Sequence, residues 1–195
     1  MGRSCPREYT TERLLLRQPR SEDAPEIFSE YAGDPAVGKF LAWPIHKNLE
    51  DTHEFLAFCD SEWSSRPGGP YLIFSCDGST LLGSTGLAFE SDERASTGYV
   101  IAQRHWGKGI ATEALGAITE IATQIRLASL YALCHPDHVA SQNVLKKNGF
   151  RLTGTVEKGC PFPNQPNPDR RDVLCFEWAK LTGNRHDEAR DIAQE

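Results

Sequence analysis

The chain has 195 residues, a formal net charge of −6, and 39% hydrophobic and 25% charged residues. This length suits one domain with its own core, which we expect over residues 1–182, followed by a frayed polar tail over residues 183–195. The acidic balance argues against general affinity for nucleic acid or an anionic membrane surface. No apolar run approaches the roughly 18 residues that a membrane span needs, so we expect neither kind of partner.

Alternating apolar residues predict strands, and apolar residues spaced three and four apart predict helices. After a loose arm over residues 1–8, the predicted strands cover residues 12–17, 71–76, 80–90, 94–102, 129–134, 152–158 and 172–179. The predicted helices cover residues 21–33, 49–63, 111–125 and 138–147, and Ser21 is the expected cap of the first. Residues 36–48 are predicted to be irregular. This order of elements predicts an α+β fold with one mixed sheet.

Turn signals separate several of these elements. Asp77-Gly78 predicts a hairpin between two strands. Gly149 is the expected C-cap of the last helix. The stretch between the last two strands is rich in proline, which excludes a helix or a central strand there.

The cysteines are scattered along the chain and none forms a Cys-x-x-Cys pair, so a structural zinc site has little support and we expect no metal. Scattered cysteines in a chain of this size suit a reducing cytosol, which predicts a cytoplasmic protein. The six are Cys5, Cys59, Cys76, Cys134, Cys160 and Cys175.

The segment from Gln103 to Ala111 lies where a predicted strand changes into a predicted helix. Gly107 and Gly109 allow backbone torsions that other residues resist and a close approach to a ligand. The first N–H groups of a helix have no partner inside the helix, and they point outward at the positive end of its dipole. Nearby positive charge comes from Arg104, His105 and Lys108. The segment therefore predicts a seat for a diphosphate, with a tight turn as the plain structural alternative.

Two common phosphate loops do not fit this segment. The Gly-x-x-x-x-Gly-Lys-Ser/Thr pattern is absent, and Thr112 stands where the dinucleotide fingerprint has its third glycine. The pattern Arg104-x-x-Gly107-x-Gly109 instead resembles the acetyl-CoA motif of the GNAT acetyltransferases.

Three further blocks resemble the same family, and specifically the branch that acetylates ribosomal-protein N-termini. They are Thr11-Glu12-Arg13-Leu14-Leu15-Leu16-Arg17, the stretch from Trp43-Pro44 to Phe55-Leu56, and residues 136–150 with Ser141, Lys147, Gly149 and Phe150. Together the resemblance spans about residues 9–181. His138 is a departure, because the family usually has Asn there.

The resemblance implies the GNAT fold: a single mixed, mostly antiparallel sheet with splayed central strands, flanked by about four helices, and acetyl-CoA as co-substrate. It implies that backbone N–H groups near Trp106 to Ala111 hold the diphosphate and that strand residues 100 and 101 pair with the pantetheine arm. The expected cofactor-binding residues are Val100, Ile101, Arg104, His105, Trp106, Gly107, Lys108, Gly109, Ile110, Ala111, Thr112, His138 and Ser141.

Ser141 lies one helical turn after His138 and shares its face. In the branch resembled, this serine is proposed to give a proton to the departing thiolate. A thiolate with a pKa near ~8.5 leaves with little help, so a hydrogen bond or a relay suffices. A helix-terminal serine that bonds backbone is the alternative. Glu90 is the first candidate to orient the amine or a water. Tyr99, on the neighbouring strand, is expected to line the same cleft. For both residues a plain surface or core role is the alternative.

The predicted reaction is direct attack of a primary amine on the acetyl thioester. An α-amine with a pKa near ~8 is about a tenth neutral at pH 7, whereas neutralising a lysine amine would need ~3 kcal/mol more. We therefore expect a protein or peptide N-terminal α-amine as acceptor. A small-molecule amine (polyamine, antibiotic or metabolite) and a non-catalytic CoA-binding module are the alternatives. Trp43, His46, Glu90 and Phe162 are expected to line the acceptor site, with ordinary packing as the alternative, and the protein is expected to be a monomer or a homodimer.

A hydrolase triad or metal site is the competing interpretation of residues 135–141, which contain His135, Asp137, His138 and Ser141. A hydrolase serine usually sits on a Gly-x-Ser-x-Gly turn, and the neighbours of Ser141 are Ala140 and Gln142. His135 is expected in a loop rather than on the helical face. We therefore favour the acetyltransferase interpretation.

Overall fold

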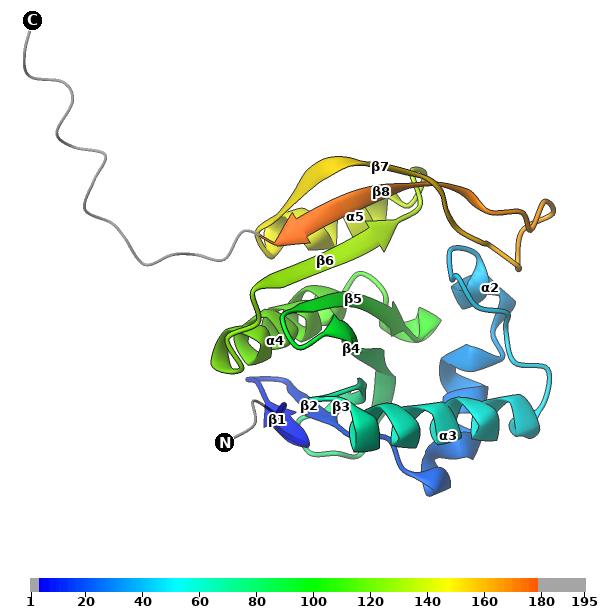
Figure 1. The fold of residues 1–195 in the computed structure, drawn as a ribbon. Helices are drawn as coiled ribbons and strands as arrows, with labels where there is room; N and C mark the ends of the chain where they lie inside the picture. The colour runs from blue at the N-terminus through cyan, green and yellow to red at the C-terminus, as the bar shows by residue number, and fades with distance from the viewer. Residues whose placement is uncertain (1–3, 179–195) are drawn as a thin grey trace, which may run out of the picture.

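A computed structural model describes residues 4–178. Within this range one mixed sheet has the strand order β1-β2-β3-β4-β5-β6-β8-β7 (Figure 1). The strands are β1 (Glu8–Thr10), β2 (Leu14–Arg17), β3 (Pro70–Ser75), β4 (Leu81–Ser91), β5 (Arg94–Ile101), β6 (Ser129–Cys134), β7 (Phe150–Cys160) and β8 (Arg171–Trp178). The helices are α1 (Ala24–Ile27), α2 (Pro35–Gly38), α3 (Leu49–Ser65), α4 (Ile110–Gln124) and α5 (Val139–Lys147).

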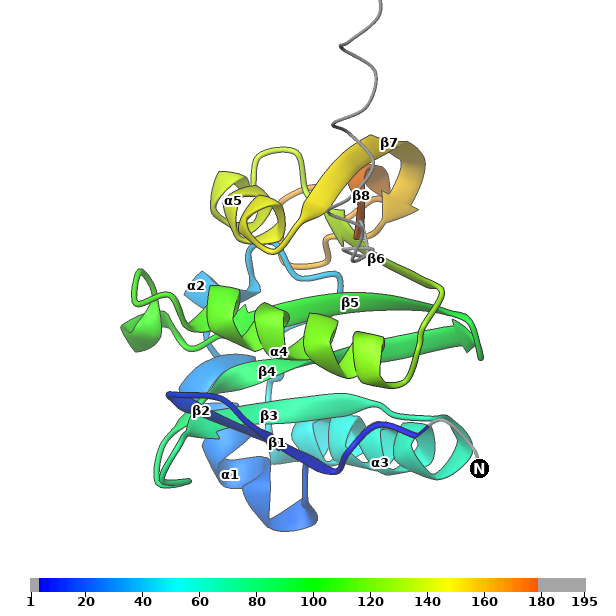
Figure 2. The same cartoon turned by 90° about the vertical axis from the view of Figure 1, so that its left-hand side faces the viewer.

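Helices cover both faces of the N-terminal part of the sheet (Figures 1 and 2). Successive strand residues point to opposite faces, and β3 follows this rule. Tyr71 and Ile73 pack in the core under α4, while Leu72 and Phe74 pack in the core that α1 and α3 cover. The apolar positions predicted for α4, residues 114, 115, 118, 121, 122 and 125, are all buried. The single sheet, in the strand order given above, confirms the predicted mixed, mostly antiparallel sheet.

The N-terminal arm differs from the expectation. Cys5 is buried, and its N–H donates to the carbonyl of Pro67 at 2.6 Å. Residues 8–10 form β1, which pairs antiparallel with β2. The prediction of a loose arm over residues 1–8 is wrong for Cys5 and Glu8, because contacts distant in sequence hold them and no local pattern reveals such contacts.

The first predicted helix is broken into three pieces. A 3₁₀ turn covers Ser21–Asp23, α1 follows, and a π-helical turn covers Phe28–Ala32. Arg20 rather than Ser21 is the N-cap, and the Asp23 carboxylate accepts the N–H of Arg20 at 2.7 Å. The stretch predicted to be irregular contains the short α2, whose first turn Asp34 caps through the N–H of Ala36.

The turn prediction at Gly78 is confirmed, because this residue has φ +74° between β3 and β4. At the end of α5 the C-cap is Asn148 rather than Gly149, and Gly149 follows it with φ +80°, in the left-handed region that favours glycine. The predicted tail over residues 183–195 and the last predicted residues of the domain, 179–182, lie outside the described residues.

The central strands β5 and β6 part from each other. They run parallel and pair only from Arg94 to Ser96 on β5 and from Ser129 to Tyr131 on β6. β5 then continues to Ile101 and β6 to Cys134 without pairing with one another, as Figure 1 shows. The splayed strands that the sequence resemblance implied are therefore present.

Candidate active site

The open edge of β5 presents backbone groups to the space between the two splayed strands. The N–H of Ala102 donates to the carbonyl of Leu82 on the β4 side at 2.9 Å. Because backbone groups alternate in direction along an antiparallel ladder, Val100 also faces β4, whereas Tyr99 and Ile101 face the open side. Of the two predicted residues, 100 and 101, the backbone of Ile101 is the one that a bound chain can reach.

The predicted diphosphate seat lies at the end of this edge. After β5 comes a 3₁₀ turn over Gln103–His105, and then Gly107 with φ +74° and Gly109 with φ +78°. Gly109 is the N-cap of α4 and no side chain caps the first turn. The N–H groups of Ile110, Ala111 and Thr112 therefore point outward, which is the arrangement that binds an anion.

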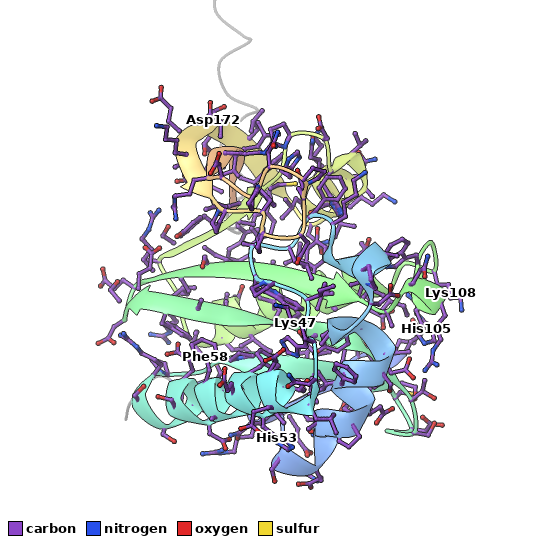
Figure 3. All side chains as sticks on the ribbon, turned by 90° about the vertical axis from the view of Figure 1, so that its right-hand side faces the viewer. Lys47, His53, Phe58, His105, Lys108 and Asp172 are labelled. Carbon is purple, nitrogen blue, oxygen red and sulfur yellow. The ribbon has the colours of Figure 1, made fainter. Side chains whose placement is uncertain are left out.

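The charged residues of the loop differ in their surroundings. The guanidinium of Arg104 lies 2.6 Å from the carboxylate of Glu30 and donates to Nε2 of His105 at 3.0 Å. Burial, together with the nearby Lys108 and Arg104 charges, lowers the pKa of His105, so this ring is neutral at pH 7. His105 and Lys108 project from the same edge of the molecule (Figure 3). Lys108 therefore supplies the loop's uncompensated positive charge, since Glu30 neutralises Arg104.

Trp106 connects the loop to the end of β5. Its indole N–H donates to the carbonyl of Ile101 at 2.7 Å, while half of the side chain is exposed. This bond occupies the carbonyl of Ile101 and leaves its N–H on the open side of β5.

Tyr99 and Ser141 meet across the space between β5 and α5. The hydroxyl of Tyr99 lies 3.0 Å from the carbonyl of Ser141 and 2.9 Å from its Oγ. Since a phenol has one hydrogen and donates it to the carbonyl, Ser141 Oγ–H donates to the Tyr99 oxygen. Burial raises the pKa of Tyr99, and burial likewise raises that of Cys134, whose thiol interacts with Ser141. The groups in this cluster are therefore neutral at pH 7.

His138 is the N-cap of α5, and its ring lies in an aromatic cluster. The ring centroid of Phe40 lies 4.4 Å from that of His138 and 5.0 Å from that of His135. Phe162 packs against His135 at 4.6 Å and is 3% exposed. Burial lowers the pKa of His138, so the ring is neutral at pH 7. The predicted acceptor residue Phe162 thus lies in the packed interior behind His135.

Trp43 and His46 lie together on the segment before α3. Their ring centroids are 5.4 Å apart, and Nδ1 of His46 lies 2.9 Å from the hydroxyl of the buried Thr52. Burial lowers the pKa of His46. Trp43 packs against the core cluster that α1 and α3 cover, to which Val100 of β5 also belongs.

Asn164 joins this segment to the proline-rich loop between β7 and β8. Its amide nitrogen donates to the carbonyls of Gly38 and Trp43, both at 2.9 Å, and its oxygen accepts the N–H of Ile45 at 2.9 Å. We call this set of contacts the Asn164 clasp. A surface pocket lies beside it, lined by Lys47, which lies near the centre of Figure 3, and by prolines of both segments: Pro35, Pro44, Pro163 and Pro166.

Glu90 lies apart from these groups. It is near the end of β4 that meets the start of β5, and its carboxylate binds Arg94 at 2.9 Å and the hydroxyl of Tyr131. Tyr131 belongs to the last paired position of β5 and β6, whereas Tyr99 lies beyond it. The structure does not bring Glu90 to the Tyr99–Ser141 pair, and it shows Glu90 in an ion pair at the closed end of the splayed strands.

The competing triad is not assembled. Nδ1 of His135 accepts the N–H of Asp137 at 3.1 Å, and the Ser141 hydroxyl bonds Tyr99 rather than a histidine. Within residues 4–178, no three His, Cys, Asp or Glu side chains gather as a metal site would require. In the same range, no helix has both the length and the apolar character to cross a membrane.

Sequence reasoning gave no role to several residues that shape the site. Asn164 and Phe40 act through contacts with segments distant in the chain, and Glu113 binds Arg13 from the other side of α4. Arg13 belonged to one of the family blocks, but no sequence pattern links it to Glu113, which is 100 residues away.

Comparison with known proteins agrees with this geometry. The acetyltransferase (GNAT) domain family matches residues 13–151. The uncharacterized N-acetyltransferase p20 of Bacillus licheniformis is 26% identical over 149 residues, which are 75% of this chain and 83% of the relative.

Two solved structures share the fold. The ribosomal L7/L12 α-N-protein acetyltransferase RimL in complex with coenzyme A has a TM-score of 0.74 at 22% identity, covering 87% of this chain and 95% of that one. The microcin C7 self immunity acetyltransferase MccE in complex with acetyl-CoA and AMP has a TM-score of 0.75 at 19% identity, covering 86% and 92%.

The splayed sheet, the glycine loop and the family match together define an acyltransferase. The chain belongs to the GNAT acetyltransferase family.

Proposed function

We propose that this enzyme moves the acetyl group of acetyl-CoA to a primary amine by direct attack, and that its preferred acceptor is the N-terminal α-amine of a protein or peptide. The observation that carries the proposal is the open edge of β5, which has the uncapped glycine loop at its end and the Tyr99–Ser141 pair beside it.

The residues present fit a CoA thioester. The outward N–H groups at the start of α4 and the charge of Lys108 suit a diphosphate. The free N–H of Ile101 and the backbone of Tyr99 suit an extended chain with amide groups, which can pair with a strand edge. The CoA and acetyl-CoA complexes of RimL and MccE, which share this fold, support the same assignment. Bound there, acetyl-CoA supplies an activated acetyl group.

The Tyr99–Ser141 pair would serve the departing sulfur. Ser141 Oγ–H donates to Tyr99, and a rotation of this hydroxyl would direct its hydrogen bond to the sulfur while Tyr99 stays on the Ser141 carbonyl. The N–C bond forms as the C–S bond breaks, and the proton lost by the amine passes through water to the departing thiolate. Tyr99 keeps its own proton because burial raises its pKa. The help required is modest, since a thiol with a pKa near ~8.5 is a good leaving group. The N–H of Ile101 would stabilise negative charge on the acetyl oxygen.

The titratable groups around the Tyr99–Ser141 pair are neutral, and this supports an acceptor amine of modest basicity. His138, Tyr99 and Cys134 all carry pKa shifts that favour the neutral form. The carboxylate of Glu90 lies at the far end of β5 and supplies no base to this cluster, so the remaining proton acceptor is the weakly basic neutral imidazole of His138. An α-amine near pKa ~8 supplies about a tenth of its molecules already neutral at pH 7, whereas a lysine amine near ~10.4 supplies fewer than about one in a thousand.

An acceptor panel tests this proposal. Peptides with free N-termini, the same peptides blocked at the N-terminus but carrying lysine, and small amines would be compared for release of CoA. We expect turnover with free N-termini and at least about tenfold less with the blocked peptides, following the difference in neutral amine. Turnover confined to small amines would overturn the acceptor class. Binding of acetyl-CoA without turnover on any amine would indicate that the protein is a non-catalytic CoA-binding module.

A cytoplasmic location is part of the proposal. All six cysteines are free, which suits a reducing compartment.

A further inference from the structure

Glu113 places a negative charge beside the proposed anion seat. It lies in the first turn of α4, directly after the residues whose N–H groups point outward. A carboxylate at this end of a helix is attracted to the helix dipole, just as a bound diphosphate would be. An uncompensated Glu113 would therefore compete with an anionic ligand and repel it.

The structure turns this carboxylate to the other side of the helix and neutralises it. One oxygen accepts the hydroxyl of Thr11 at 2.6 Å and the backbone N–H of Arg13 at 3.0 Å. The other oxygen lies 2.6 Å from Nε and 2.5 Å from Nη2 of Arg13. These partners come from the turn that precedes β2, 100 residues away in the sequence.

Arg13 also holds the glycine loop itself. Its Nη1 donates to the carbonyl of Lys108 at 3.1 Å, and a Cβ added to Gly109 would lie 3.5 Å from its Nη2. In a planar trans peptide the carbonyl and the following N–H point in opposite directions. Because the carbonyl of Lys108 points to Arg13, the N–H of Gly109 points away from Arg13 and outward.

We propose that Arg13 and Glu113 form a positioning pair for the donor's diphosphate: Arg13 cancels the Glu113 charge and orients the peptide between Lys108 and Gly109. Neither side chain touches the reacting atoms. This inference rests on the proposed acetyl-CoA site and adds residues whose effect should fall on donor affinity alone.

Steady-state kinetics of Arg13→Met, Glu113→Gln and the double variant would test the pair. Arg13→Met should raise KM for acetyl-CoA about five- to tenfold, the size of a charge effect at a helix terminus, with kcat and the acceptor KM unchanged. The double variant should recover at least half of this loss on a logarithmic scale, because the glutamine side chain that replaces Glu113 carries no charge. An equal loss in the Glu113→Gln background would show that Arg13 acts independently of the Glu113 charge and would overturn the pair.

Two controls separate this role from a general structural one. Arg20→Met removes a surface arginine whose Nη2 lies 3.8 Å from Glu8, away from the loop, and should leave KM for acetyl-CoA unchanged. S-acetylpantetheine lacks the diphosphate, so Arg13→Met should use it as well as the unaltered chain does. A loss that persists with this truncated donor would overturn the proposal.

Binding measurements separate a failure of the positioning pair from a failure of the proposed function. Dissociation constants for CoA, measured by calorimetry on the full chain, should rise in Arg13→Met by the same factor as KM. Equal affinity in the variant and the unaltered chain would contradict the positioning pair while leaving the enzyme intact. If the unaltered chain does not bind CoA, the proposed CoA site itself is wrong.

Discussion

The proposed donor side and the proposed acceptor side of this enzyme are built in different ways. The donor loop is one contiguous stretch from the end of β5 to the start of α4. The acceptor side combines a segment before α3 with the loop between β7 and β8, more than 100 residues later, and the Asn164 clasp joins them. A short motif can therefore encode the donor loop, which Arg13 supports from a distant segment, whereas the proposed acceptor side depends throughout on contacts between segments that are free to vary separately.

The largest expected effect comes from breaking the donor loop. Gly109→Trp forces a large side chain into a left-handed conformation at φ +78°, directly where the first N–H groups of α4 begin. The backbone strain of about 1–2 kcal/mol favours a different loop conformation, so acetyl-CoA affinity should fall at least about fivefold, and steric exclusion should add to this. Calorimetric titration with CoA measures it.

Gly154→Ala is the matched control for that variant. An added Cβ at Gly154 meets no atom within 4 Å, and the residue lies on β7, so CoA affinity should not change. Unchanged affinity in Gly109→Trp would mean that the donor does not bind at this loop.

Ser141 bonds Tyr99 at the open side of β5, where the acetyl thioester is proposed to lie, so its loss should affect the chemical step more than either binding site. Ser141→Ala should lower kcat by roughly ten- to a hundredfold, the low end of acid catalysis, with little change in either KM. Tyr99→Phe keeps the Ser141 hydroxyl and should cost less. Presteady-state release of CoA would measure the step, and an unchanged rate in Ser141→Ala would remove this residue from the mechanism.

Breaking the clasp should affect the acceptor side alone. Asn164→Ala removes three hydrogen bonds, each contributing about 0.5–1.5 kcal/mol, and frees the segment that carries Trp43. We expect a several-fold rise in acceptor KM, an unchanged KM for acetyl-CoA and a lower Tm. Gln165→Ala, which removes one bond to Lys39, is the milder comparison. A rise in the acetyl-CoA KM of equal size would show that the two sides are not independent.

The smallest effect is a pH dependence of stability. Burial lowers the pKa of His138 and His46, so the folded chain binds fewer protons than the unfolded chain near their unfolded pKa of about 6.5. The contribution of these two histidines to the free energy of unfolding is therefore full above that pH and is lost as the pH falls below it. His138→Asn should make the curve of Tm against pH shallower between about pH 5 and 7. An unchanged curve would contradict the burial of a neutral His138.

The sequence predicted α4 and the glycine loop before it, and there is a physical reason for this. Helical spacing marked α4, and two glycines between a strand and a helix marked the loop, because both depend on neighbours in the chain. The Arg13–Glu113 pair, the packing of Phe162 behind His135 and the Asn164 clasp depend on tertiary contacts. Glu90 shows the same limit, since a residue near a strand end can lie at either end of the splayed strands, and pairing with Arg94 and Tyr131 decides which.

Thermal unfolding with and without acetyl-CoA tests the central claim most directly, with NAD and ATP as controls. A ligand at a hundred times its dissociation constant adds about 2.7 kcal/mol, which corresponds to a rise in Tm of roughly 5–10 °C for a chain of this size. We expect this rise with acetyl-CoA and with CoA, and none with NAD or ATP. No rise at millimolar acetyl-CoA, or an equal rise with ATP, would contradict a CoA site between the splayed strands.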